Sequence, residues 1–445
     1  MYAIIGAGPM GLCTARQLKK HGIPFVGFEL HSDVGGLWDI DNPHSTMYDS
    51  AHLISSKSTT EFSEFPMRPE VAVYPHHSEM RGYFRDYARH FGLYEHYQFN
   101  TRVLAVERLE KGWKLTSEQA GERREWLVDG VLIANGTLHT PNLPRLPGEF
   151  SGELLHSSAY RSADIFAGKR VLIVGCGNSA CDIAVDAVHR AASVDISVRR
   201  GYYFLPKFIL GRPTDTFGGA IKLPRPIKQF LDGLLIRALV GKPSQYGLPD
   251  PDYRLYESHP VMNSLVLHHL GHGDIRPRRD IAAIDGQQVT FSDGEQAEYD
   301  LILLGTGYKL DYPFIDRAHL NWPQGAGAPQ LYLNVFHPEY DDLFMMGMVE
   351  ASGLGWQGRD EQAELVALYI RQLQAGSPAA LRFKQLKRDK ARVRVDGGYH
   401  YLNLERMAYY VHKDSYRASV RHHSEELRQG LSSQPLAPSR PVAQH

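Results

Sequence analysis

The stretch Tyr2-Ala3-Ile4-Ile5-Gly6-Ala7-Gly8-Pro9-Met10-Gly11 decides the fold of this chain. Its first four residues predict a short buried strand, and residues 10–21 are compatible with a helix. The spacing Gly6-x-Gly8-x-x-Gly11 between them is the dinucleotide-binding fingerprint, in which glycines allow a tight turn and a close approach to a pyrophosphate. The N–H groups at the start of the following helix point at that phosphate. The sequence therefore predicts a Rossmann-type unit, with Pro9 and Met10 also next to the cofactor.

The residue that ends the second strand indicates which nucleotide this unit binds. Residues 25–28 predict that strand, and Glu29 follows it, 18 residues after Gly11. A carboxylate here accepts hydrogen bonds from both ribose hydroxyls and repels a 2′-phosphate, so we expect FAD. Gly36-Leu37-Trp38 comes next, and the Gly35-Gly36 pair fits a second close approach to the pyrophosphate. Trp38 either walls the flavin or is a core aromatic residue.

A second fingerprint stands in the middle of the chain. Gly175-Cys176-Gly177-Asn178-Ser179-Ala180 follows a strand at residues 170–174, precedes a helix expected over residues 181–190, and leads to a strand at 194–198. Arg199 and Arg200 end that strand where the first unit has Glu29. Two guanidinium groups there can bind a 2′-phosphate, which favours NADPH, although a solvated basic pair is the simpler alternative. Two such units in one chain indicate a flavoprotein that a nicotinamide nucleotide reduces.

Composition limits the remaining classes of function. The 445 residues are enough for two or three domains, and 49 basic residues balance 50 acidic ones, so no nucleic-acid partner is expected. No apolar run reaches the ~18 residues that span a bilayer, so we expect no integral membrane segment. Three cysteines give no disulfide framework, which favours the reducing cytoplasm. We interpret Cys13, Cys176 and Cys181 as small buried hydrophobic residues.

Further motifs give the chain a family resemblance. Phe150, Gly152, His156 and Tyr160 match the F-x-G-x-x-x-H-x-x-x-(Y/F) motif just before the second fingerprint, and Thr306-Gly307-Tyr308 follows an apolar strand. In this order, the motifs resemble those of the flavin-containing monooxygenases, the class B flavoprotein monooxygenases of the bacterial type, from residue 1 to about 410. The related Baeyer-Villiger enzymes end the motif with Trp-Pro, whereas this chain has Tyr160-Arg161.

The resemblance implies an α/β fold with two Rossmann-like dinucleotide-binding domains. The NADPH-binding domain, residues 155–290, would be inserted into a discontinuous FAD-binding domain, residues 1–150 and 295–415. Thr306 and Gly307 would lie at the cofactors, and a helix carrying residues 362–372 would place Gln362 and its positive N-terminal end at the flavin pyrimidine. His156 is expected to be an interdomain anchor. The histidine-rich and Pro/Ser-rich residues 421–445 are expected to be a disordered tail.

The implied activity uses FAD, NADPH and O2. NADPH would reduce the flavin, oxygen would add at flavin C4a, and one oxygen atom would pass to an amine nitrogen or a sulfide sulfur of a small organic molecule. The main task of the protein would be to keep water out. The alternatives are a weakly coupled NADPH oxidase, a Baeyer-Villiger-type enzyme on the same scaffold, and a nucleotide-binding redox sensor without turnover. A homodimer is compatible with the sequence.

One position departs from the family pattern. Many members carry an Asn after a Met-Tyr pair, here Met47-Tyr48, and that Asn supports the oxygenated flavin. Alignment on the surrounding residues places Ile54 there. The nearby polar residues that could replace the Asn as catalytic groups are His52, Ser55 and Ser56.

Two other features have simpler interpretations. His268, His269 and His272 have helical spacing but no acidic partner of the H-E-x-x-H kind, and we predict no metal site. Residues 227–240 predict an amphipathic helix that covers the second domain, walls the substrate path, or contacts a membrane surface.

Overall fold

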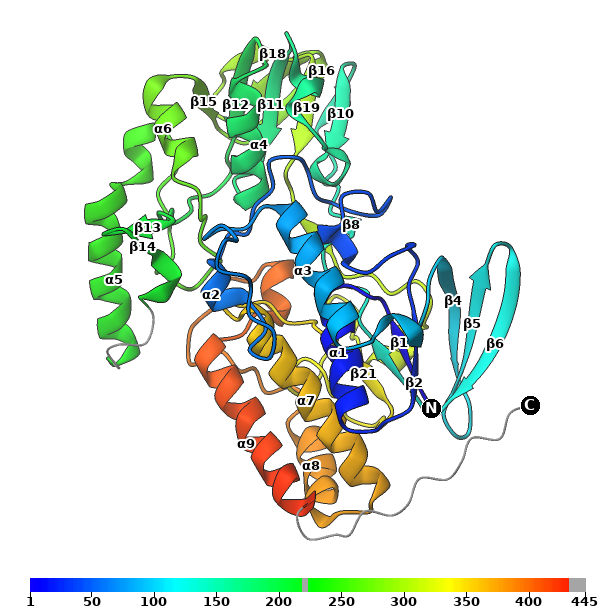
Figure 1. The fold of residues 1–445 in the computed structure, drawn as a ribbon. Coiled ribbons are helices and arrows are strands. Elements are labelled where there is room, and N and C mark those ends of the chain that lie inside the picture. Colours follow the sequence, from blue (N-terminus) through cyan, green and yellow to red (C-terminus); the bar gives the residue numbers. More distant parts are fainter. Residues whose placement is uncertain (218–222, 432–445) are drawn as a thin grey trace.

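The computed structural model describes residues 1–217 and 223–431. It contains two parallel five-stranded sheets, each flanked by helices, in two domains that lie one above the other (Figure 1). Within these residues no helix combines the length and the hydrophobicity needed to cross a bilayer. The predicted α/β class with two Rossmann-like units is confirmed.

The first sheet forms the core of the first domain. Its strand order is β21-β7-β1-β2-β3, all parallel, with β1 (Tyr2–Ile5), β2 (Phe25–Phe28), β3 (Tyr97–Gln98), β7 (Gly130–Ile133) and β21 (Leu343–Met345). Both faces are covered, which is why the strands are continuous apolar runs. Alternate side chains of β1, such as Ile4, pack against α1 (Pro9–Lys20), α3 (His77–His90) and α7 (Gly355–Gln374). The opposite set, such as Ile5, packs against the antiparallel sheet of β4 (Thr101–Arg108), β5 (Trp113–Gln119) and β6 (Glu122–Val128).

The second sheet has the order β10-β19-β11-β12-β15. Its strands are β10 (Glu153–His156), β11 (Arg170–Val174), β12 (Ser193–Ser197), β15 (Ile275–Arg278) and β19 (Leu301–Leu304). One face packs against α4 (Asn178–Val188) and α6 (Leu265–His272). The other face packs against a smaller sheet of β9 (Gly148–Phe150), β16 (Ile281–Gly286), β17 (Gln288–Phe291) and β18 (Gln296–Glu298).

The expected return to the first domain at residue 295 is corrected by this topology. β19 pairs with both β10 and β11, and Leu301 and Ile302 are fully buried in the second domain. The chain crosses only after Leu304, where β20 (Tyr308–Lys309) pairs antiparallel with β8 (Thr140–Pro141). These two crossovers therefore run side by side and join the domains.

The C-terminal helices α7, α8 (Pro378–Asp389) and α9 (Lys413–Leu431) form a layer on the first domain. The expected disordered tail from residue 421 is wrong up to residue 431, and residues 432–445 lie outside the described part. Tyr416, Val420 and Leu427, at helical spacing, are buried against this layer, and Arg417 forms a bidentate ion pair with Glu361. The composition of residues 421–445 did not reveal this helix, because polar residues lie between the few apolar ones that it buries.

Two buried polar contacts fix this layer to the rest of the first domain. The Lys387 side chain in α8 is fully buried, and its Nζ lies 3.0 Å from Asp341 Oδ1 and donates to the His337 carbonyl at 2.6 Å. In α7, Asp360 accepts a hydrogen bond of 2.9 Å from Gln17 of α1, and burial raises the pKa of Asp360 to about 6.

Shorter elements complete the fold. α5 (Arg225–Val240) turns Gln229 and Ile236 inward and leaves Phe230 66% exposed, so its apolar side chains do not simply cover the domain. Next to it lies the hairpin of β13 (Phe208–Ile209) and β14 (Arg212–Pro213), and α2 (Lys57–Thr60) lies near the start of α7. Single 3₁₀ turns are formed by Gly36–Trp38, Tyr94–His96, Ser157–Ala159, Ala163–Phe166, Thr214–Thr216, Pro243–Tyr246, Arg317–Leu320 and Glu405–Tyr409.

Candidate active site

The first fingerprint folds into the turn that its glycines predict. Gly6 has φ +106°, and a Cβ atom on Gly11 would lie 1.9 Å from the Gly6 carbonyl oxygen. Gly8 is the N-cap of α1 and has no side-chain cap, and Pro9 is the first helical residue. Met10 is buried, with its Cγ 2.7 Å from where a Cβ on Gly347 would lie. The first turn of the helix thus keeps N–H donors available for an anion such as a pyrophosphate.

Glu29 lies directly beside this turn. Its Oε2 accepts the Ala7 N–H at 2.6 Å and its Oε1 accepts the His31 N–H at 2.8 Å. Burial raises the pKa of Glu29, against these two hydrogen bonds, which lower it. The carboxylate is therefore held rigidly at the carboxyl end of β2, where a ribose would lie.

The Gly36-Leu37-Trp38 segment closes over the same turn. A Cβ on Gly36 would lie 2.9 Å from Gly8 Cα, so the two backbones lie close together here, while the predicted approach to a pyrophosphate stays a prediction. Leu37 and Trp38 are half-buried. The Trp38 ring meets Trp356, at the start of α7, edge to face with centroids 6.3 Å apart. Trp38 therefore packs against the core cluster while part of it stays exposed.

The second fingerprint repeats the arrangement with one difference. Gly175 has φ +112°, and a Cβ there would lie 2.5 Å from the Gly305 carbonyl oxygen. A Cβ on Gly177 would meet nothing within 4 Å, so this residue faces open space at the uncapped start of α4. The helix begins at Asn178, three residues before the predicted start. Asn178 binds the neighbouring loop, accepting the Met262 N–H at 2.7 Å, and Ser179 lies beside the Tyr48 hydroxyl.

Arg199 and Arg200 follow the carboxyl end of β12. Arg199 is exposed. The Arg200 guanidinium lies 5.0 Å from the centroid of the Tyr202 ring, and its Nε donates to the Tyr202 hydroxyl at 3.2 Å. Among the ion pairs of residues 1–217 and 223–431, none involves either arginine. Both charges are thus without a carboxylate partner in the part of the chain that the structure describes.

Thr306 and Gly307 lie in the returning crossover. The Thr306 hydroxyl donates to the Asn142 carbonyl at 2.5 Å, and the Gly307 carbonyl accepts the Asn142 N–H at 2.9 Å. Gly307 has φ +82° and a Cβ there would be unobstructed. The pair thus holds the two crossovers together beside the interdomain space.

The family motif lies where the domains meet. His156 ends β10, its Nδ1 accepts the Ser158 N–H at 3.1 Å, and its ring contacts Tyr308 edge to face. Burial lowers the pKa of His156. Tyr160 is fully buried and donates to Asp186 at 2.9 Å. These contacts are those of an anchor rather than of a proton-transfer group.

Ile54 lies in the segment from Met47 to Thr60, which contacts the second domain. Ile54 is half-buried and His52 is exposed, with its ring 4.9 Å from that of His76. The Ser55 hydroxyl is 2.7 Å from that of Thr60. The Ser56 N–H donates to Asp215 of the second domain at 2.7 Å. Asp215 could not be found from the sequence, because nothing local connects it with Ser56.

Gln362 does not lie at a helix N-terminus. α7 begins at Gly355, so Gln362 is in its second turn, fully buried. Its Oε1 accepts the Gly347 N–H at 2.9 Å, and its Nε2 donates to the Tyr416 hydroxyl. The expected helix start at Gln362 is therefore wrong, since α7 begins at Gly355. That the N-terminal end of this helix lies at a flavin stays a prediction.

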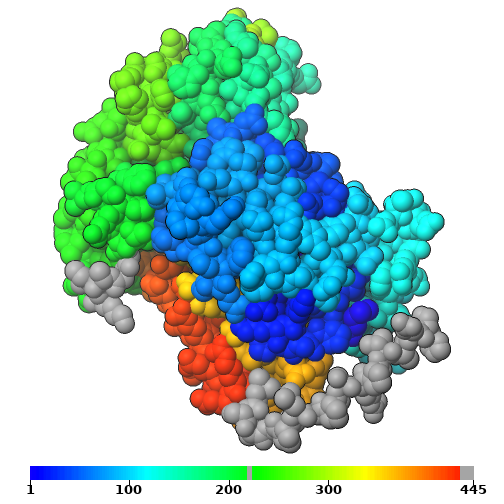
Figure 2. All heavy atoms as spheres, in the orientation of Figure 1, coloured from blue at the N-terminus to red at the C-terminus, as the bar shows by residue number. Residues whose placement is uncertain are grey.

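The start of α7 also meets the Met47 to Thr60 segment. A Cβ on Gly355 would lie 2.4 Å from the Thr59 carbonyl oxygen, and the Phe62 and Trp356 rings are 6.0 Å apart. In the space-filling view the blue early part of the chain lies directly against the green second domain (Figure 2). Trp38 and the Met47 to Thr60 segment thus both meet the start of α7, which is distant from them in the sequence.

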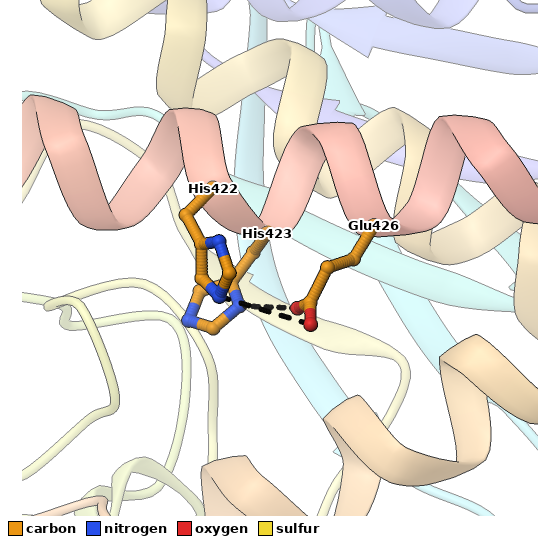
Figure 3. A group of neighbouring side chains, drawn as sticks. All are labelled: His422, His423 and Glu426. Carbon is orange, nitrogen blue, oxygen red and sulfur yellow. Dashed lines mark hydrogen bonds and ion pairs between the residues drawn. The ribbon is translucent and has the colours of Figure 1, made fainter.

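Histidines group at two places. His268, His269 and His272 lie on α6, where His269 pairs with Asp274 at 2.9 Å. A different set, His422, His423 and Glu426 on α9, brings its ligand-type atoms within 4.8 Å of one another (Figure 3). His423 Nδ1 is 3.1 Å from Glu426, and its Nε2 is 2.7 Å from the Tyr332 hydroxyl. Both ring nitrogens therefore already have protein partners.

The fold and the two glycine turns are typical of proteins with two dinucleotide-binding units, and comparison with known proteins identifies the family. The sequence profile of the flavin-binding monooxygenase-like family matches residues 1–420. The chain is 28% identical over 419 residues to "Dimethylaniline monooxygenase [N-oxide-forming] 2" from Pan troglodytes, covering 89% of this chain and 78% of that protein. It therefore belongs to the flavin-binding monooxygenase-like family, whose members are oxidoreductases, and the resemblance seen in the motifs is confirmed.

Solved structures share the fold at low identity. S-allyl-L-cysteine S-oxygenase from Allium sativum superposes with a TM-score of 0.64 at 20% identity, covering 98% of this chain and 89% of that one. Cyclohexanone monooxygenase in its open form gives a TM-score of 0.70 at 20% identity, with 96% and 98% covered.

Proposed function

We propose that this protein is an NADPH- and O2-dependent monooxygenase that transfers one oxygen atom to an amine nitrogen or a sulfide sulfur of a small organic molecule. The observation that carries the proposal is the contrast between the two glycine turns. One has the buried carboxylate of Glu29 at the position where a ribose would lie. The other has the guanidinium groups of Arg199 and Arg200, which have no carboxylate partner among residues 1–217 and 223–431. An acid selects a nucleotide without a 2′-phosphate, and two arginines select one that has it.

The residues present fit both cofactors. Gly8 and Gly36 would hold the FAD pyrophosphate with the N–H groups of α1, and Glu29 would bind its ribose. Gly177 leaves open the space that a second pyrophosphate needs at the start of α4. When bound, the flavin supplies hydride acceptance and oxygen activation.

The chain's own residues then shape the space between the domains. Ile54 adds an apolar surface and no hydrogen bond, while Ser55 and Ser56 already bond within the protein. Trp38 and Trp356 add aromatic surface at the start of α7. These side chains exclude water from the reacting atoms, and exclusion of water limits the loss of activated oxygen as peroxide.

The relatives support nitrogen or sulfur as the acceptor. One is named for N-oxide formation and one for S-oxygenation, whereas a structural neighbour acts on cyclohexanone. This chain has Arg161 after the motif tyrosine, and Arg161 donates to the Ser45 carbonyl at 2.7 Å. A weakly coupled NADPH oxidase is the second candidate, favoured by the apolar Ile54.

The test measures NADPH oxidised, product formed and hydrogen peroxide released, with N,N-dimethylaniline and thioanisole under ¹⁸O2. An N-oxide or sulfoxide that carries the label, formed in proportion to NADPH, supports the monooxygenase. Peroxide equal to the NADPH consumed with both compounds would establish the oxidase instead. Binding of both nucleotides without NADPH consumption would refute both enzymatic proposals.

A further inference from the structure

The Met47 to Thr60 segment belongs to the first domain by sequence but is fixed to the second domain. Tyr48 and Ala51 are buried in the apolar cluster of the second domain. The Tyr48 hydroxyl donates to Asp182 of α4 at 3.2 Å, and Ser50 donates to Asp186 of the same helix. Arg161 accepts the Asp49 N–H through its carbonyl at 2.8 Å. The conformation of this segment is therefore set by the second domain together with the first, to whose Pro75 and Val73 carbonyls the Leu53 and Lys57 N–H groups donate.

Asp215 makes the most concentrated of these contacts. It lies in the Thr214–Thr216 turn of the second domain. Its carboxylate accepts the Ser56 N–H at 2.7 Å, the Ser56 hydroxyl at 2.9 Å and the Thr59 hydroxyl at 2.6 Å. A carboxylate with three donors, one of them a backbone N–H, forms stronger and more directional hydrogen bonds than a neutral acceptor.

The structure gives this carboxylate no competing partner. Asp215 takes part in none of the ion pairs among residues 1–217 and 223–431, so its charge is satisfied by the donors of the Ser56 turn. Ser56 is 1% exposed, and water cannot readily replace the lost acceptor. A buried donor that loses its acceptor drives the backbone toward another conformation.

Movement at Ser56 would be transmitted to the candidate active site in two directions. Ile54 lies two residues earlier in the same turn. Thr59, which Asp215 also binds, has its carbonyl 2.4 Å from where a Cβ on Gly355 would lie, so it is packed tightly against the start of α7. The contact with Asp215 therefore helps to fix the turn that carries Ile54 and the packing of Thr59 against the start of α7.

We propose that Asp215 is a positioning residue for oxygen transfer: from the second domain it holds the Ser56 turn so that Ile54 closes the site against water. The proposal rests on the proposed monooxygenase function. Loss of the carboxylate should raise peroxide release and lower the product formed per NADPH, while NADPH oxidation continues.

The first experiment uses no flavin chemistry. Hydrogen exchange is followed in the flavin-free protein and in the Asp215→Asn and Asp215→Ala variants. The Ser56 amide should exchange about tenfold faster or more in Asp215→Ala, because its acceptor is gone, and the increase should be smaller in Asp215→Asn. The control is Asp316→Asn, since Asp316 caps a turn within the first domain by accepting the Ala318 N–H at 2.9 Å. Unchanged exchange at Ser56 in both Asp215 variants would overturn the proposed contact.

The second experiment measures coupling in the FAD-loaded enzymes with NADPH and thioanisole. Asp215→Asn should raise peroxide per NADPH about threefold or more with the flavin reduction rate unchanged, whereas Asp316→Asn should match the parent. In a Ser56→Ala background the same Asp215 substitution should have a moderately smaller effect, because one of the three donors to the carboxylate is then absent while the Ser56 N–H and the Thr59 hydroxyl remain. Full coupling in Asp215→Asn and in Asp215→Ala, with faster exchange at Ser56, would refute the positioning role. A parent enzyme that forms no product at all would refute the proposed function instead.

Discussion

Replacement of Arg200 by Ala should shift coenzyme preference from NADPH toward NADH. The Arg200 guanidinium is already oriented by the Tyr202 ring and hydroxyl, so a 2′-phosphate would find a preorganised partner. A hydrogen bond between charged groups contributes about 1.5–3 kcal/mol, and about 1.4 kcal/mol is a factor of ten. We therefore expect the ratio of kcat/KM for NADPH to that for NADH to fall about 10- to 100-fold. Arg199 is exposed and unstacked, so Arg199→Ala should have the smaller effect.

The assay is steady-state oxidation of both coenzymes at one ionic strength, because screening alone would change the ratio. The matched control is Arg190→Ala. Arg190 follows α4 at the opposite edge of the second sheet and pairs with the exposed Asp164 at 3.4 Å, so its removal changes the charge of the domain without touching the turn. An equal loss of kcat/KM for both coenzymes in Arg200→Ala would refute the assignment of the 2′-phosphate site.

Three further predictions concern the same framework. Gly177→Ala should raise the KM for NADPH but leave the melting temperature unchanged, because a Cβ there meets nothing. Gly175→Ala should instead destabilise the protein through strain at its positive φ. Similar melting temperatures for the two variants would contradict this prediction. Lys387→Met should lower the free energy of unfolding, measured in urea, by about 2–5 kcal/mol, because it leaves buried acceptors without a donor. The control Lys384→Met should lower it by less than about 1 kcal/mol, because the Lys384 side chain is more exposed. Asp360→Asn should stabilise the protein by about 1–2 kcal/mol at pH 7. The reason is that the pKa of Asp360 is about 6 in the folded state and about 3.9 in the unfolded state. Between pH 4 and 6 the unfolded protein therefore loses this proton before the folded protein does, so the stability of the parent falls over that range. The advantage should vanish below about pH 4, and an advantage independent of pH would contradict it.

The fold was predictable because its signals are local. Buried parallel strands are short apolar runs, and Tyr2–Ile5, Phe25–Phe28 and Arg170–Val174 have the bounds expected from the sequence. Glycines at fixed spacing marked both turns, and the structure explains their need through contacts that a Cβ would make. The burial of all three cysteines was predicted by the same kind of reasoning and is confirmed.

The start of α7 shows where local reasoning stopped. Gly355 and Gly358 disfavour a helix by intrinsic propensity, so the sequence placed the start at Gln362. In the structure a Cβ on Gly358 would lie 2.5 Å from Leu354 Cδ1, and one on Gly355 would meet the Thr59 carbonyl oxygen. These glycines allow close packing at the start of α7, and this packing outweighs their low helix propensity.

The candidate active site could be predicted only in part, because one of its walls depends on long-range contacts. Ser56 and Asp215 are 159 positions apart, and no spacing rule connects them. In the sequence alignment, Ile54 stands where many family members have a hydrogen-bonding Asn. In the structure it belongs to a turn that a carboxylate of the other domain holds through three donors, so an apolar residue there can close the site instead of supporting it by a hydrogen bond. Whether Ile54 weakens coupling therefore depends on how firmly Asp215 holds the turn, and the two effects separate only when Asp215 and Ile54 are varied singly and together.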